Sequence, residues 1–74
     1  MWKVVGFKKR VKNEKTYVDL FISRPCAGGE GQEVRALNYS EGYITYKPQL
    51  GDTIMFSMGV YNGRQYVQDI QKLR

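Results

Sequence analysis

Five short runs of alternating apolar and polar residues, separated by turn signals, constrain the fold of this chain most strongly. Apolar residues do not recur at the i, i+3, i+4 and i+7 spacing of an amphipathic helix. Runs rich in Val, Ile, Tyr and Phe recur instead at the two-residue period of a strand. The sequence therefore predicts an all-β protein, with strands at residues 2–11, 16–24, 32–39, 52–60 and 64–70.

The segments between these runs carry the signals of turns and loops. Asn62-Gly63 is the strongest signal, because both residues tolerate the positive φ angles of a two-residue type I′ turn. A polar turn at residues 12–15 is expected to join the first two strands into a long hairpin. The glycine-rich segment 25–31 predicts a mobile loop, and segment 40–51 a folded connection without a helix.

Seventy-four residues suffice for one small domain, which we expect to span residues 1–74. Five short antiparallel strands cannot form an immunoglobulin-sized sandwich, and an open sheet would leave unprotected edges. A small closed, five-stranded antiparallel barrel avoids both problems. Its long first hairpin and long third-to-fourth connection favour the OB-fold type, with an SH3-like barrel as the alternative. The small size also suggests a homodimer.

Residue counts exclude several classes of function. The chain has one cysteine and no histidine, so an internal disulfide is excluded and no metal site, cofactor or catalytic residue is predicted. We therefore expect a protein that is not an enzyme and has no small-molecule substrate. No apolar run approaches the roughly 20 residues needed to span a bilayer, and no signal peptide is evident. These features predict a cytoplasmic protein without a membrane partner.

Positive charge is concentrated at the start of the chain. The sequence has 12 Lys and Arg residues against 7 Asp and Glu, a formal net charge of +5. The first fifteen residues carry six of these cations and one carboxylate, and the remaining charges balance. Such a concentration indicates a polyanionic partner. The alternative is that these lysines only protect a strand edge against aggregation.

Two aromatic residues of the second strand lie on the face opposite its aliphatic residues. Val18, Leu20 and Ile22 share the face expected to form the core, which leaves Tyr17 and Phe21 on the other. Exposed rings interleaved with cations are typical of proteins that bind single-stranded nucleic acid, since bases stack on rings and cations contact phosphates. The alternative is that a loop, a second copy or another protein covers the rings.

The predicted binding residues fall into three groups. Lys8, Lys9, Arg10 and Lys12 are expected to contact phosphates. Tyr17 and Phe21 are expected to stack on bases, and Arg24, Arg35 and Tyr39 to extend the track across the sheet. The partner is single-stranded DNA or RNA, and the sequence does not decide between them.

The end of the chain resembles known OB-fold domains. Residues 51–56 (GDTIMF) and 61–67 (YNGRQYV) resemble the closing strands of many of these domains, including bacterial translation initiation factor 1. In plan and composition the whole chain is similar to the small dimeric single-stranded DNA-binding proteins of filamentous phages. This resemblance implies sequence-independent coating of single strands, DNA in preference to RNA, in replication of a phage, plasmid or mobile element. The competing interpretation is a protein-interaction barrel serving as an accessory subunit or regulator.

Overall fold

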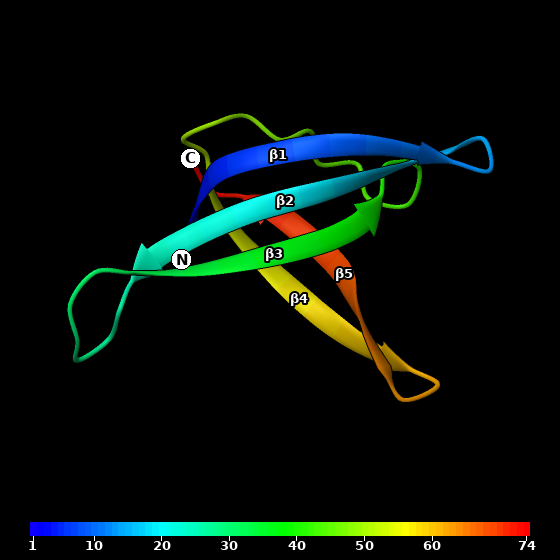
Figure 1. Cartoon of the computed structure of the whole chain (residues 1–74). Helices are drawn as coiled ribbons and strands as arrows, with labels where there is room; N and C mark the ends of the chain where they lie inside the picture. The colour runs from blue at the N-terminus through cyan, green and yellow to red at the C-terminus, as the bar shows by residue number, and fades with distance from the viewer.

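The computed structural model describes all 74 residues, from Met1 to Arg74, and contains five strands and no helix (Figure 1). The strands are β1 (Trp2–Lys12), β2 (Lys15–Pro25), β3 (Gln32–Ser40), β4 (Thr53–Tyr61) and β5 (Arg64–Lys72). The predicted strands are thereby confirmed, with boundaries that differ by one or two residues. No helix is present that would be long and apolar enough to cross a membrane.

All five strands belong to one antiparallel sheet in the order β3-β2-β1-β4-β5. The sheet is strongly twisted and bent, so that β4 and β5 cross beneath the layer of β1, β2 and β3 (Figure 1). The two outermost strands, β3 and β5, contact each other without forming a hydrogen-bonded ladder. The fold is thus of the predicted small five-stranded β-barrel type, but the sheet is not closed as predicted, because β3 and β5 share no hydrogen-bonded ladder.

Both predicted hairpin turns adopt the mirror-image geometry that suits a twisted β-ribbon. Asn13 and Glu14 have φ angles of 52° and 65°, and Asn62 and Gly63 have φ angles of 52° and 75°. Positive φ at both central residues matches the twist of a type I′ turn to that of the flanking strands. These turns fix the pairing of β1 with β2 and of β4 with β5.

The core lies between the two layers of the bent sheet. Val18, Leu20 and Ile22 point into it from β2 and are almost completely buried. The other buried apolar residues come from every strand and from the connection before β4: Trp2, Val4, Leu37, Tyr39, Ile44, Ile54, Val67 and Ile70. The face of β2 that carries Tyr17 and Phe21 therefore points away from the core, as the sequence predicts.

A β-bulge at Val5 divides β1 into two parts. Val4 pairs with Ile22, but Gly6 rather than Val5 pairs with Phe21, so the alternation of side chains shifts by one residue. Before the bulge, Trp2 and Val4 point into the core. After it, Lys8 and Arg10 share the outward face with Phe21 instead of following Val4 inward. A bulge reverses side-chain direction in this way because the extra residue has no partner on the neighbouring strand.

A buried carboxylate anchors the connection between β3 and β4. Asp52 is 7% exposed, and the Tyr46 hydroxyl donates to its Oδ2 at 2.6 Å while Lys72 Nζ lies 3.6 Å from its Oδ1. Burial and the adjacent carboxylate raise the pKa of Tyr46 well above its ordinary value, so its hydroxyl remains a donor. Within the same connection Ile44 is buried and Tyr46 packs against the core, whereas Tyr43 is exposed.

Removing the Tyr46 hydroxyl with Tyr46→Phe should lower the free energy of unfolding by about 1.5–3 kcal/mol, the usual value of a hydrogen bond to a charged group. Tyr39→Phe is the matched control, because the buried Tyr39 hydroxyl has no hydrogen-bond partner. Its removal should leave stability unchanged or raise it. Urea denaturation measures both, and equal losses in the two variants would contradict the assigned role of Asp52.

Candidate nucleic-acid interface

The solvent-facing side of β1, β2 and β3, here called the outer face, consists of three central rows of paired residues. One row is Gly6, Phe21 and Ala36, the next is Lys8, Asp19 and Asn38, and the third is Arg10, Tyr17 and Ser40. Because directly paired residues of antiparallel strands point to the same side of the sheet, each row forms a continuous strip across three strands.

Both aromatic side chains on the outer face have small neighbours. Phe21 lies between Gly6 and Ala36, and Ser40 is the β3 neighbour of Tyr17. An added Cβ at Gly6 would lie 3.6 Å from Cδ2 of Phe21, so the ring leans over the space that the glycine leaves. Neither ring is fully buried. Small neighbours on both sides of Phe21, and on the β3 side of Tyr17, therefore leave part of each ring open to a stacking partner.

Cations dominate the same face. The pairing places five basic residues on it against one carboxylate, that of Asp19. These cations are Lys3, Lys8, Arg10, Lys12 and Lys15. Among them only Arg10 forms an ion pair within the protein. The four lysines, three on β1 and Lys15 on β2, are thus available to an external anion.

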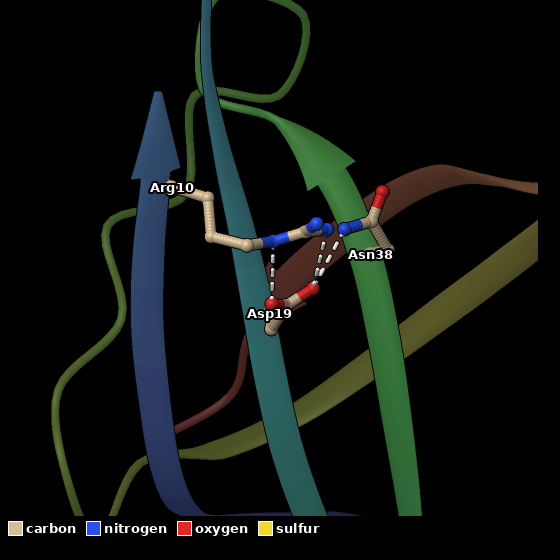
Figure 2. Close-up of polar contacts among 3 residues, drawn as sticks. All are labelled: Arg10, Asp19 and Asn38. Carbon is tan, nitrogen blue, oxygen red and sulfur yellow. Dashed lines mark hydrogen bonds and ion pairs between the residues drawn. The ribbon is translucent and has the colours of Figure 1, made fainter. Parts of the chain in front are cut away.

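Asp19 organises the centre of the outer face (Figure 2). Arg10 Nε lies 2.9 Å from its Oδ2, and Arg10 Nη2 donates to its Oδ1 at 3.2 Å. Asn38 Nδ2 also donates to Oδ1, at 2.7 Å. The Asn38 hydrogen bond, followed by Arg10, lowers the pKa of Asp19 below its ordinary value of 3.8 despite partial desolvation. The network holds one side chain from each of three strands in a fixed arrangement.

This lowered pKa predicts how the difference in stability between the native protein and Asp19→Asn depends on pH. A carboxylate with a lowered pKa in the folded state stabilises the protein above its unfolded-state pKa, and this contribution is lost as the pH falls through the lower folded-state value. Asp19→Asn should therefore be less stable than the native protein at pH 7, and the difference should shrink below about pH 3.8. Unfolding of both proteins between pH 7 and pH 2 measures it, and a difference independent of pH would contradict it.

Four of the predicted binding residues lie outside the outer face. Lys9 pairs with Val18 on the other side of the sheet, and its Nζ lies 3.3 Å from Glu41 Oε2. The guanidinium of Arg24 lies 4.2 Å from the centre of the Trp2 ring and binds the carboxylate of Glu33.

Arg35 and Tyr39 also belong to the inward-pointing series of β3. The Arg35 guanidinium lies 5.1 Å from the centre of the Phe56 ring. Tyr39 is only 4% exposed, and burial raises its pKa to about 12. The expected continuation of the track through Arg24, Arg35 and Tyr39 is therefore not on the surface that carries Tyr17 and Phe21.

The structure also adds residues that the sequence analysis missed. Lys3, Lys15 and Asn38 lie on the outer face, and Gly6 gives space to the Phe21 ring. The only signal that identifies them is the strand register. A single sequence does not fix that register, because the bulge at Val5 reverses the alternation within β1.

The chain matches no family model, no curated protein and no solved structure with which it was compared. No group of three or more His, Cys, Asp or Glu side chains is arranged to hold a metal ion. What defines the site is therefore its own composition: a sheet face with two partly open rings beside a row of cations.

Proposed function

We propose that this protein is not an enzyme and binds single-stranded nucleic acid, with little sequence preference, through its outer face. The observation that carries this proposal is the placement of two partly open rings, Phe21 between Gly6 and Ala36 and Tyr17 between Arg10 and Ser40, on the same face as unpaired lysines of β1. Bases stack on aromatic rings whatever their identity, and lysines follow the phosphates. By resemblance to the phage proteins we favour DNA over RNA and a role in replication.

The partly open rings of the outer face favour single strands over duplex. Duplex readers usually insert a helix or a two-stranded ribbon into the major groove. The outer face instead is a three-stranded surface with two partly open rings, which suit bases that are free to unstack. A stacked base pair hides its flat faces from such rings.

Salt dependence provides the first test, because each phosphate contact contributes about −0.7 to the slope of log K against log salt for single strands. Labelled oligo-dT should bind tightly at low salt, bind more weakly as salt rises, and bind better than a duplex of equal length. Fluorescence anisotropy measures all three. Absence of binding to either oligonucleotide at low salt would overturn the proposal.

Two neighbouring lysines provide a matched pair of variants. Lys8 lies on the outer face, whereas Lys9 lies on the other side of the sheet and pairs with Glu41. Lys8→Ala should reduce the magnitude of the salt slope by about 0.7, and Lys9→Ala should leave it unchanged. Equal effects would show that total charge, not the outer face, governs binding.

One observation favours the competing function of a protein-interaction barrel. Val5 and Val34 are 50% and 65% exposed near the end of the outer face where Phe21 lies. Exposed apolar and aromatic residues together are typical of interface cores between proteins. The alanine variants considered in the Discussion separate the two functions.

A further inference from the structure

One hollow in the outer face is lined by a ring, two cations and two amides. Its lining residues are Arg10, Lys12, Asn13, Tyr17 and Asn38. It lies beside the β1–β2 turn, has a volume of about 340 Å³ and is open to solvent. This volume is near the lower end of the roughly 300–1,000 Å³ of small-ligand sites. The hollow is therefore of small-ligand size.

The Asp19 network determines which polar atoms of Arg10 and Asn38, two residues that line this hollow, are already used. A carboxylate only accepts hydrogen bonds, so the Asn38 amide must turn its NH₂ group toward Asp19. Its Oδ1 consequently points away from Asp19 and remains a free acceptor (Figure 2). Arg10 uses Nε and Nη2 to bind the same carboxylate, which leaves Nη1 as a free donor. A fixed donor on β1 and a fixed acceptor on β3 thus flank the central strand β2.

This arrangement suits the Watson–Crick edge of an unpaired base. Each of the common bases presents a hydrogen-bond acceptor beside a donor on that edge, such as O4 and N3–H of thymine. Diagonal neighbours in an antiparallel sheet lie about 7–8 Å apart, so a base stacked on Tyr17 can reach Asn38. In a duplex this edge is already paired.

We propose that the hollow is a nucleotide subsite in which an unpaired base stacks on Tyr17 while Arg10 and Asn38 bind its Watson–Crick edge. Lys12 is then placed to contact the adjoining phosphate. This inference rests on the proposed function and extends it, because it gives a hydrogen-bonding reason for selecting single strands. It also explains tolerance of sequence, since all four bases offer the required pair of groups.

Methylation of thymine at N3 tests the subsite directly. Oligo-dT carrying N3-methylthymine at every position keeps its phosphates and its stacking faces but loses the N–H donor. The native protein should bind it about tenfold more weakly than oligo-dT, as expected from losing one hydrogen bond and leaving an acceptor unpaired. Anisotropy titrations with both oligonucleotides measure the ratio.

Two variants locate the effect. In Asn38→Ala the methylation penalty should disappear, because the acceptor is gone. The control is Gln71→Ala on β5, which removes an exposed amide that also donates to a carboxylate, that of Asp69; its penalty should equal that of the native protein. Circular dichroism confirms that both variants are folded.

The outcomes distinguish the two proposals. If the native protein fails to bind oligo-dT, the proposed function is wrong. If it binds both oligonucleotides equally, or if Asn38→Ala keeps the full methylation penalty, the subsite is wrong and single-strand binding by the outer face stands.

Discussion

Replacing both Tyr17 and Phe21 with alanine is expected to weaken oligo-dT binding by about 30-fold to about 20,000-fold. Each stacked base contributes about 1–3 kcal/mol, and each 1.4 kcal/mol is a factor of ten in affinity. Both rings point away from the core, so the double variant should fold normally. Anisotropy titration at low salt, with circular dichroism as the folding check, measures the effect.

The control for this result is a double variant of two exposed tyrosines elsewhere, Tyr43→Ala with Tyr61→Ala. Their side chains are 64% and 72% exposed and lie outside the three rows of the outer face. The control should bind within about twofold of the native protein. Equal losses in both double variants would contradict the assignment of stacking to Tyr17 and Phe21.

Sedimentation of the same Tyr17 and Phe21 variant separates nucleic-acid binding from protein interaction. Unchanged assembly with lost oligonucleotide affinity supports stacking. Lost assembly with unchanged affinity supports an interface between protein chains, because interface cores depend on aromatic side chains.

The second large effect concerns stability. Leu20 is completely buried and pairs with Leu37 at the centre of the β2–β3 ladder. Leu20→Ala should lower the free energy of unfolding by about 2–5 kcal/mol, because apolar burial is lost and a cavity is left behind. The whole free energy of unfolding of a domain of this size is typically about 3–5 kcal/mol. The variant should therefore be largely unfolded at 37 °C, as thermal denaturation monitored by circular dichroism would show.

Val60→Ala is the matched control, since its side chain is 69% exposed at the end of β4. Its effect should stay within about 0.5 kcal/mol, as is usual for surface positions. A Leu20→Ala protein as stable as the control would contradict the core described here.

Local chemistry made the strands and turns predictable. The alternation of Val18, Leu20 and Ile22 with Tyr17 and Phe21 reports burial directly, because successive side chains of a strand point to opposite faces. Asn62-Gly63 specified its turn because few other residue pairs tolerate the required φ angles. Neither inference needs knowledge of distant contacts.

The candidate site was predictable only in part. Lys8, Arg10, Lys12, Tyr17 and Phe21 lie together on the outer face as expected. Arg24 and Arg35 did not join them, because their positions in β2 and β3 have the same parity as the core residues, and each guanidinium lies over an inward ring. That two residues lie on adjacent strands does not show whether their side chains point to the same side of the sheet.

The sequence by itself determined the strand content, the hairpin turns, the buried face of β2 and the concentration of positive charge in β1. Only the tertiary structure decided which of the cations share a surface with the rings. The bulge at Val5 turns Lys8 and Arg10 outward and leaves Lys9 on the other side. The physical reason is that alternation fixes the directions of side chains relative to one another within a strand, but a single bulged residue reverses the directions that follow it. The position of that residue depends on how the strand pairs with its neighbours.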